Sequence, residues 1–269
     1  GFTPRPPTAL SYSTPIHRPA MASTSLSSLR TASPTVTSSP VLKRALDVTC
    51  CVIALPFLAV ATLFVALLTT ITSPGPIFFR QVGVGRGGRK FRLYKFRTMH
   101  VSAETVSHQA HFAELVKSNT PMQKLDARGD SRLIPGGWLI RAAGLDELPQ
   151  LLNILRGEMS LVGPRPCIPY EYDQYTTSQR ERFTATPGLT GLWQVSGKNR
   201  TTFEEMVAFD IEYARRQSVW LDLWIIAMTI PALVTQISDQ RKAKKIARVG
   251  TAFNATPAIH SAQVAQVGQ

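Results

Sequence analysis

The sequence has few cysteines, and their spacing suits neither crosslinks nor metal binding. It contains three, Cys50, Cys51 and Cys167, and the first two are adjacent inside an apolar run. This spacing indicates neither a disulfide framework nor a zinc site. We therefore expect a protein that faces a reducing compartment. Among the five histidines, His108 and His111 lie three residues apart, but no further metal ligands accompany them.

Acidic residues are also scarce. The chain has 17 Asp and Glu against 30 Lys and Arg, so its formal net charge at pH 7 is +13 over 269 residues. Such an excess requires an anionic partner, and nucleic acid, an anionic membrane surface and a phosphorylated substrate all qualify. A chain of this length predicts one ordinary domain, with or without tails.

Both ends of the chain lack a sustained hydrophobic pattern. Residues 1–40 are rich in Ser, Thr, Pro and Ala, with almost no acid and no cleavable signal peptide, and we expect a disordered tail there. Residues 237–269 predict a basic, disordered tail, in which the run from Arg241 to Lys245 would lie on anionic lipid.

The longest hydrophobic run extends from Ala45 to about Ile71, which is long enough for a helix to span a bilayer. Pro56 lies near its middle and would kink the helix. Basic residues flank both ends, and they favour the cytoplasm for both. We predict a re-entrant membrane helix over residues 41–73. A plain transmembrane helix and the buried core helix of a soluble protein are the alternatives.

A basic β-hairpin is predicted after this segment. Residues 77–82 and 90–96 alternate like strands, and the glycine-rich stretch Gly85-Arg86-Gly87-Gly88 joins them. The hairpin carries many Arg and Lys residues and no acid. These residues could form a solvated face, but beside a membrane helix we expect them to meet phosphates or anionic lipid headgroups.

Two adjacent carboxylates, Asp146 and Glu147, lie beside Pro149 at the predicted start of an amphipathic helix. The partial positive charge at a helix N-terminus keeps such side chains ionised, which a nucleophile or a metal ligand requires. Most acidic pairs in a first turn only cap the helix. Glu204 and Glu205, which fit a capping box, illustrate that ordinary role in the same chain.

The segment that begins ten residues after Leu151, at Leu161, contains a rigid turn with a single arginine, Gly163-Pro164-Arg165-Pro166. The prolines restrict the backbone and so fix the position of Arg165. An acidic pair and a fixed arginine so close in the sequence indicate phosphate chemistry.

Three later segments complete the pattern. The glycine-punctuated stretch over residues 187–197 predicts a close approach to a ligand, and a plain β-turn is the alternative. A helix is expected from about Thr202 to Gln217. The apolar run from Val219 to Val234, with Trp220 and Trp224, looks too short to span and predicts a helix in the headgroup plane.

From Lys43 to about Val234 the chain resembles the bacterial sugar transferases, the monotopic phosphoglycosyl transferases that start exopolysaccharide and other surface-glycan assembly. No single segment carries the resemblance; their order along the chain does. The segments are Lys43-Arg44-Ala45-Leu46-Asp47-Val48, Tyr94-Lys95-Phe96-Arg97-Thr98-Met99, Asp130-Ser131-Arg132, Leu145-Asp146-Glu147-Leu148-Pro149-Gln150, Gly157-Glu158-Met159-Ser160-Leu161-Val162-Gly163-Pro164-Arg165-Pro166 and Pro187-Gly188-Leu189-Thr190-Gly191.

The resemblance implies a membrane-associated α+β fold with a re-entrant membrane helix, a small β-hairpin and a helical catalytic domain over residues 74–236, with interfacial amphipathic helices. It implies that Asp146 and Glu147 are the catalytic dyad. Asp146 would attack a UDP-sugar, release UMP and hold a phosphosugar that polyprenyl phosphate then accepts. Mg²⁺ held by the dyad and phosphate oxygens is the expected cofactor.

The remaining site residues follow from the same resemblance. Arg165 is the expected phosphate clamp, with Lys95, Arg97 and Arg141 as supporting cations. Gln194 and Arg200 would contact the uridine or the sugar. The chain departs from the family at Thr186, where a basic residue is common, and at Leu55, where Ser often precedes the proline.

We expect a location at the cytoplasmic face of the bacterial inner membrane, with membrane lipid as a partner and no nucleic acid. A non-enzymatic basic membrane adaptor is the alternative function. The identity of the sugar and the oligomeric state, including a homo-oligomer, stay open at this stage.

Overall fold

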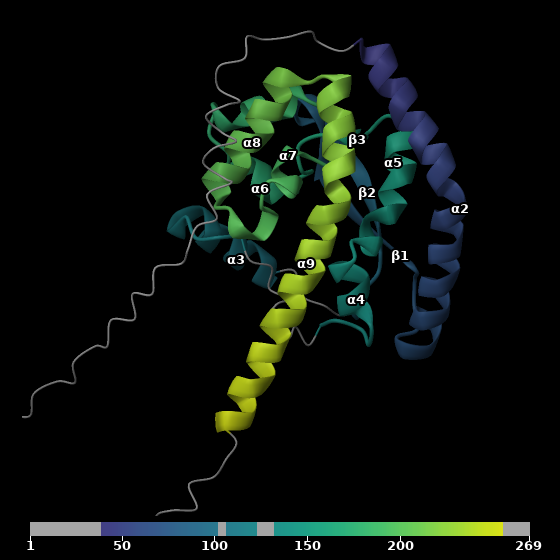
Figure 1. Ribbon diagram of the computed structural model, residues 1–269, viewed down its shortest axis with the longest axis vertical. Coiled ribbons are helices and arrows are strands. Elements are labelled where there is room, and N and C mark those ends of the chain that lie inside the picture. The colour runs from purple at the N-terminus through teal and green to yellow at the C-terminus, as the bar shows by residue number, and fades with distance from the viewer. Residues whose placement is uncertain (1–38, 102–105, 123–131, 255–269) are drawn as a thin grey trace, which may run out of the picture. The chain divides into compact units, whose positions relative to one another are not determined.

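The computed structural model of the chain describes residues 39–101, 106–122 and 132–254, without the side chains of residues 106–109, 199 and 240–254. Its first element is helix α2, which runs from Pro40 to Thr72. Pro56 lies inside this helix without ending it, and Figure 1 shows one continuous, gently curved helix. The predicted helix is therefore confirmed, but the chain does not reverse its direction at Pro56.

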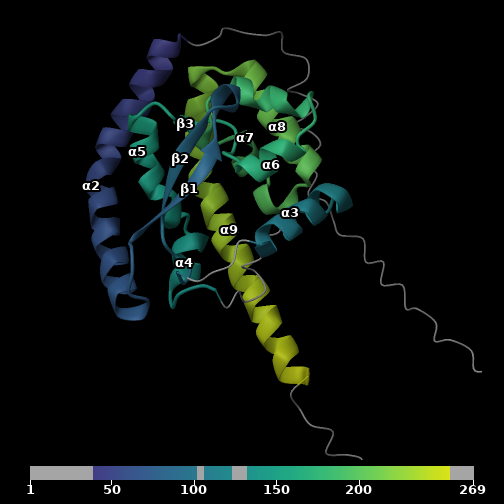
Figure 2. The ribbon, with the colours of Figure 1, turned by 180° about the vertical axis from the view of Figure 1, so that it is seen from behind.

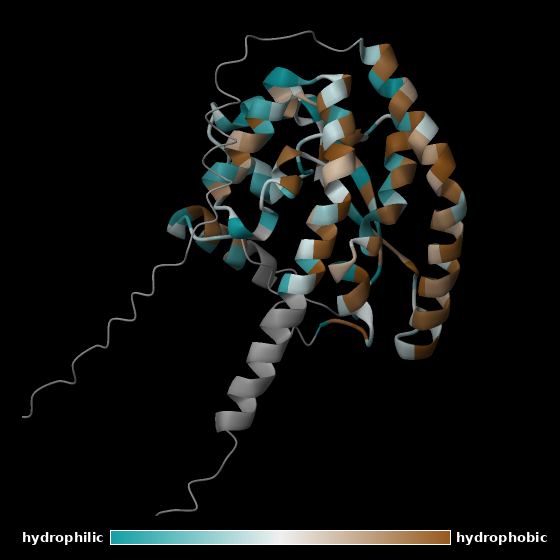
Figure 3. Cartoon of the chain, viewed as in Figure 1, coloured by the Kyte–Doolittle hydropathy of each residue, from teal (hydrophilic) through white to brown (hydrophobic). Residues whose placement is uncertain are grey.

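One face of α2 packs against the rest of the protein along most of its length. The buried positions recur at spacings of three, four and seven residues, which is one stripe of a helix. The opposite face is apolar and exposed (Figure 3), which excludes the alternative of a buried core helix. The buried stripe is formed by Asp47, Cys51, Leu58, Ala61, Val65 and Thr69. The exposed face carries Val52, Ile53, Phe57, Val60, Leu63, Phe64, Leu67 and Ile71.

The predicted β-hairpin is confirmed. Strands β1 (Phe78–Val84) and β2 (Lys90–Phe96) pair antiparallel, with Phe78 opposite Phe96 and Val84 opposite Lys90. The short 3₁₀ turn η1 (Arg86–Gly88) joins them, and Gly87 and Gly88 adopt positive φ angles of 65° and 78°. Glycine adopts this backbone region without the steric cost that a Cβ atom brings.

A second sheet pairs two short parallel strands, β3 (Ser160–Val162) and β4 (Gly188–Thr190). The described residues thus form a mixed α+β fold that is mostly helical, with two small sheets. The remaining elements are α3 (Val106–Ser118), α4 (Gly137–Ala142), η3 (Leu145–Gln150), α5 (Leu151–Leu155), α6 (Pro169–Gln174), η4 (Gln179–Thr184), α7 (Leu192–Val195), η5 (Lys198–Arg200), α8 (Phe203–Arg216) and α9 (Val219–Asn254).

Gly163 of the Gly-Pro-Arg-Pro turn lies against Gly188 and Gly191 of the 187–197 stretch, so that two backbone segments touch. A Cβ atom on Gly188 would lie 2.0 Å from the Gly163 nitrogen, and one on Gly191 would lie 2.2 Å from the Gly163 oxygen. Gly163 donates a hydrogen bond to the Thr190 carbonyl at 2.9 Å. We predicted that these glycines admit a ligand. At Gly188 and Gly191 the absent side chains instead make room for the backbone of Gly163, because two backbone segments in such close contact leave no space for a Cβ atom.

Helix α9 differs from our expectation for the last apolar run. The helix is continuous from Val219 through Pro231 to Asn254, past residue 236, where we placed the end of the ordered domain. Its segment Val219–Asp239 is long and apolar enough to cross a membrane by length and composition, so the run is not too short to span. Residues 237–254, which we expected in a disordered tail, are helical. The predicted tail up to residue 38, residues 255–269, and Asp130 and Ser131 lie outside the described part of the chain.

The hydrophobic core joins α2 to the hairpin and the middle of the chain. Cys51, Leu58 and Val65 of α2 belong to the same buried cluster as Leu93 of β2 and Ile154 of α5. Figure 1 and Figure 2 both show α5 beside α2, with the hairpin on the other side of α5. Helix α5, which follows the acidic pair, thus packs between the apolar helix α2 and strand β2.

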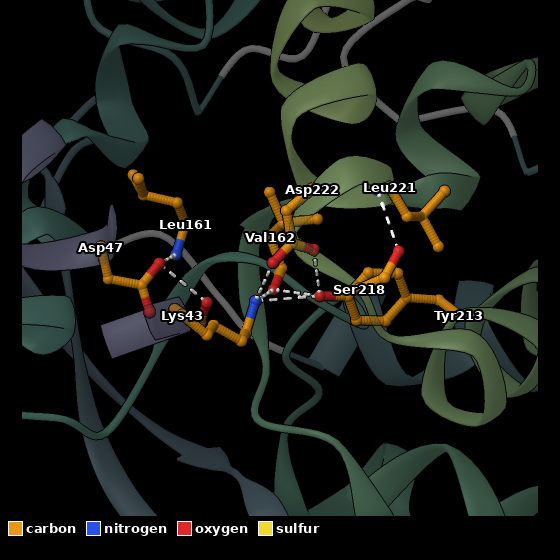
Figure 4. Close-up of polar contacts among 9 residues, drawn as sticks. Lys43, Asp47, Leu161, Val162, Tyr213, Ser218, Leu221 and Asp222 are labelled. Atoms are coloured by element: carbon orange, nitrogen blue, oxygen red, sulfur yellow. Dashed lines mark hydrogen bonds and ion pairs between the residues drawn. The ribbon is translucent and has the colours of Figure 1, made fainter. Parts of the chain in front are cut away.

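The first turns of α2 are attached to the domain by buried polar contacts (Figure 4). The ammonium of Lys43 lies 2.8 Å from the Asp222 carboxylate and 3.0 Å from both the Val162 carbonyl and the Tyr213 hydroxyl. Asp47 accepts hydrogen bonds from the Ser160 hydroxyl at 3.0 Å and the Leu161 amide at 2.9 Å. The Lys43-to-Val48 motif thus connects α2 to β3, α8 and α9.

The end of α2 is also attached. Arg97, which follows β2, is 5% exposed and donates to the Ser73 hydroxyl at 2.9 Å and to the Pro76 carbonyl at 2.6 Å. It also donates to the Ser73 carbonyl. This arginine holds the turn between α2 and β1, because its planar guanidinium satisfies several oxygens of that turn at once.

Replacing Lys43 by Met should destabilise the domain, because Asp222 is buried and would keep its charge without a cation. We expect the free energy of unfolding to fall by about 3 kcal/mol, measured by chemical denaturation of the detergent-solubilised protein. Lys117, an exposed lysine in the last turn of α3, provides the control. Lys117→Met should change the stability by less than about 0.5 kcal/mol. Equal effects of the two substitutions would contradict the anchoring role of Lys43.

Candidate active site

The acidic pair lies on the 3₁₀ turn η3, directly before α5. Gly144 precedes the turn with a positive φ of 70°, and its carbonyl accepts a hydrogen bond from the Glu147 amide at 3.2 Å. Pro149 lies within η3, and α5 begins two residues later at Leu151. The predicted helix start is confirmed, although its first turn is a 3₁₀ turn rather than an α-helical one.

The two carboxylates have different surroundings. Asp146 is 6% exposed, whereas the Glu147 side chain is 35% exposed. A 3₁₀ turn has three residues per turn, so neighbouring side chains point about 120° apart. The two groups can therefore perform different tasks although they are adjacent in the sequence.

Strand β2 brings a cation to this pair. The Lys95 ammonium lies 3.5 Å from Oε1 of Glu147, although the two residues are 52 positions apart. Asn153 of α5 holds β2 at its free edge, where its amide group donates to the Arg92 carbonyl at 2.6 Å and accepts from the Tyr94 amide at 3.2 Å. The predicted proximity of Lys95 to the acidic pair is therefore present, and α5 positions both partners.

The carboxylates also suit a hard divalent cation. Mg²⁺ prefers oxygen ligands and is commonly held by one or two carboxylates together with substrate phosphates and water. Among the described residues no group of three or more His, Cys, Asp or Glu side chains could hold a metal ion. Asp146 and Glu147 fit a site of the substrate-dependent kind better than a complete protein cage.

Arg165 lies in the predicted turn and is held from two sides. Its guanidinium is 3.1 Å from Oε2 of Glu171, a buried carboxylate that raises the pKa of Arg165. Its carbonyl accepts a hydrogen bond from Arg182 at 2.8 Å. The Arg165 side chain is still 32% exposed. The sequence therefore predicted a fixed arginine correctly, but not the carboxylate that fixes it.

A buried ion pair supports this turn from behind. Arg182 and Asp210 form an ion pair with side chains 0% and 1% exposed, and Arg182 also binds the Tyr175 hydroxyl. The Arg182 guanidinium lies 4.9 Å from the centre of the Tyr175 ring. Our sequence analysis missed both charged residues. Asp210 could have been found, because it lies on the buried stripe of α8 among Phe203, Met206, Val207 and Tyr213.

Four other predicted site residues remain, and the structure places them in different surroundings. Arg97 is wrong as a phosphate contact, because it is buried and bound to Ser73 and Pro76. Arg200 forms an exposed ion pair with Asp239 of α9 at 2.6 Å. The side-chain oxygen of Gln194 is buried beside Gly191 with no hydrogen-bond donor among the described residues. Arg141 is half-buried in the last turn of α4, five residues before Asp146.

Replacing Arg182 alone by Met should destabilise the protein strongly, because Asp210 would remain as a buried, uncompensated charge. We expect a loss of about 3–5 kcal/mol, read as a lower midpoint in chemical denaturation. The double variant Arg182→Met/Asp210→Leu should recover most of this loss, since both charges are then gone. A double variant no more stable than the single one would show that the pair is not the reason for the loss.

Comparison with known proteins places this arrangement in a family. Residues 38–236 match the model of the family described as bacterial sugar transferase. The chain is 40% identical over 196 residues to the galactosyl transferase CpsE of Streptococcus agalactiae, which covers 72% of this chain and 42% of that protein. It is 40% identical over 201 residues to the UDP-glucose:undecaprenyl-phosphate glucose-1-phosphate transferase of Caulobacter vibrioides. This match covers 72% of this chain and 70% of that protein.

A third relative is the exopolysaccharide production protein ExoY of Sinorhizobium fredii, 39% identical over 196 residues, with 71% of this chain and 84% of that protein covered. The chain thus spans less than half of CpsE but most of the two other relatives. The family match covers both anchors of α2, the acidic pair and the Arg165 turn. The chain belongs to the bacterial sugar transferase family.

Proposed function

We propose that the protein transfers a sugar-1-phosphate from a UDP-sugar to polyprenyl phosphate and so starts the assembly of a surface glycan. The named reaction of the Caulobacter vibrioides relative supports this reaction class. The observation that carries the proposal is the acidic pair of η3 with Lys95 at 3.5 Å from Glu147. This arrangement provides a carboxylate nucleophile and a cation for phosphate at one place.

The proposed reaction has two displacement steps at one phosphorus. An oxygen of Asp146 attacks the sugar-bearing phosphorus of the donor, the bond to the UMP oxygen breaks, and UMP leaves with the electron pair. A phosphate oxygen of the acceptor then attacks the same phosphorus, and the bond to Asp146 breaks. The carboxylate is regenerated and the product is a polyprenyl diphosphate sugar. Covalent storage lets a soluble donor and a membrane-bound acceptor bind one after the other.

The neighbouring cations would stabilise the charge that builds up in both steps. Bound Mg²⁺ would neutralise phosphate oxygens, with Asp146 and Glu147 as the protein ligands. Lys95 offers a positive charge beside Glu147. Arg165 keeps an exposed part of its guanidinium after pairing with Glu171, so it can donate to a phosphate without moving. Gln194 and Arg200 stay as proposed contacts to the nucleotide or the sugar.

A non-enzymatic membrane adaptor explains less of the molecule. An adaptor needs a basic surface and an apolar helix, but it has no use for a buried ion pair that positions one arginine. The Arg182–Asp210 pair and the Glu171 carboxylate both act on the Arg165 turn. We therefore favour the enzyme.

For membrane placement, we propose that both ends of α2 lie on the cytoplasmic side of the bacterial inner membrane. Lys43 and Asp47 attach the start of α2 to the domain, and Arg97 attaches its end at Ser73. A helix whose two ends are held by one domain keeps both ends on the side of that domain. These contacts support the same-side placement of both ends that the re-entrant prediction requires, and they disfavour a plain transmembrane helix.

Replacing Asp146 by Asn should reduce turnover by at least about a thousandfold, since an amide cannot serve as the nucleophile. The measurement is UMP release from a panel of UDP-sugars with polyprenyl phosphate and Mg²⁺. Asp173→Asn, at an exposed aspartate of α6, is the matched control and should retain full activity. Without acceptor, the wild type should release about one UMP per enzyme molecule, because the phosphosugar stays on Asp146. Normal turnover of the Asp146 variant would refute the assignment.

Cysteine labelling tests the placement of α2. Cysteines introduced at Ser39 and Val101, after replacement of the three native cysteines, mark the start of α2 and the domain that follows it. Both should resist a membrane-impermeant maleimide in intact spheroplasts and react after permeabilisation. Labelling at position 39 from outside, with position 101 protected, would establish a helix that crosses the membrane.

A further inference from the structure

The outward face of the hairpin carries a cluster of arginines around one tyrosine. The Arg80 guanidinium lies 5.8 Å from the centre of the Tyr94 ring, and that of Arg156 lies 5.0 Å from it. Arg80 is directly opposite Tyr94 in the sheet, and Arg92 lies two residues before Tyr94 on the same face. We call Arg80, Arg92 and Arg156 the arginine face.

The arginine face is open because the other sides of the hairpin are covered. Leu93 and Phe91 project from the opposite face of β2 into the core shared with α2 and α5. Asn153 covers the free edge of β2. All three arginines of the face are exposed. The hairpin therefore presents this surface outward, as the view in Figure 2 shows for the strands themselves.

The charges of the arginine face are not neutralised by the protein. Within the described part of the chain, none of its three arginines forms an ion pair with a carboxylate, whereas other arginines do. The paired ones are Arg165, Arg182, Arg200, Arg215 and Arg216. Three like charges on one face repel each other, and a bound anion relieves that repulsion.

Apolar side chains surround the arginine face. Val82, opposite Arg92 in the sheet, is 46% exposed, and Phe78, two residues before Arg80 on the same face, is 36% exposed. Strand β1 begins six residues after α2 ends, so the apolar outer face of α2 leads into the hairpin. Apolar side chains that alternate with arginines are typical of surfaces that lie at the membrane interface.

We propose that the arginine face binds the phosphate groups of anionic phospholipids. The proposal rests on the membrane association proposed above and adds the headgroup chemistry and the residues. Guanidinium groups bind phosphate oxygens in bidentate fashion, and the neighbouring apolar side chains enter the acyl boundary. An acidic protein surface would match the charge, but not the exposed Phe78 and Val82 beside it.

This contact would set the height of the acidic pair above the bilayer. Arg92 and Lys95 lie three residues apart on β2, about 10 Å along a strand. Lys95 contacts Glu147, so strand β2 connects the arginine face to the dyad. When the arginine face lies among lipid phosphates, the dyad lies at the depth where the phosphate of a lipid-linked acceptor is found.

Liposome flotation of the full-length protein tests the proposal without an activity assay. Wild type and the variant Arg80→Gln/Arg92→Gln/Arg156→Gln are transferred from detergent to vesicles of phosphatidylcholine, alone or with phosphatidylglycerol. Phosphatidylglycerol should raise the wild-type partition by about fivefold for each arginine engaged, and by less at high salt. The variant should float with neutral vesicles as the wild type does, but it should lose most of the increase in partition that phosphatidylglycerol causes.

The variant Arg86→Gln/Arg89→Gln/Lys90→Gln is the matched control, because it removes the same charge from the turn of the same hairpin. This control variant should retain most of the increase in partition that phosphatidylglycerol causes. Equal losses in the two variants would overturn the proposal in favour of a general charge effect, as would a wild type that floats without preference for phosphatidylglycerol. Failure to float with any vesicle would instead refute the membrane association itself.

Discussion

The ion pair between Lys43 and Asp222 connects the membrane-type helix to the catalytic part of the chain. Lys43 belongs to the first turns of α2, Asp222 to α9, and the same ammonium reaches a carbonyl of β3 and a hydroxyl of α8. Because a buried carboxylate is costly without a cation, this contact couples the stability of these four elements. The packing of these four elements in turn positions the acidic pair, the hairpin and the Arg165 turn.

Within that scaffold, close backbone packing and buried charge together produce a rigid arginine. Gly163 and Gly188 let β3 and β4 approach until no Cβ atom fits between them. Arg182 then holds the Arg165 carbonyl, and Glu171 holds its guanidinium. A cation fixed in this way loses little freedom when it binds a phosphate, so its charge is available without reorganisation.

Much of this architecture could be predicted from the sequence, and the errors have physical causes. Local patterns predicted α2, the hairpin and the helix start at the acidic pair, because periodicity and turn residues act over a few positions. Arg97 was misassigned because its partners, Ser73 and Pro76, lie more than twenty residues away. The predicted end of the last helix lies too early in the chain, because a change of composition at residue 236 does not stop a helix that already forms its hydrogen bonds.

The sequence by itself determined which chemistry the protein carries: two adjacent carboxylates, an arginine between prolines and an apolar helix flanked by cations. Residue type and spacing along the chain are enough for that. Only the tertiary structure decided which cations lie at the acidic pair and which hold the fold. Lys95 and Arg97 are two residues apart, yet one meets Glu147 and the other is buried against the turn after α2. Such a division depends on contacts between distant segments, which local patterns do not encode.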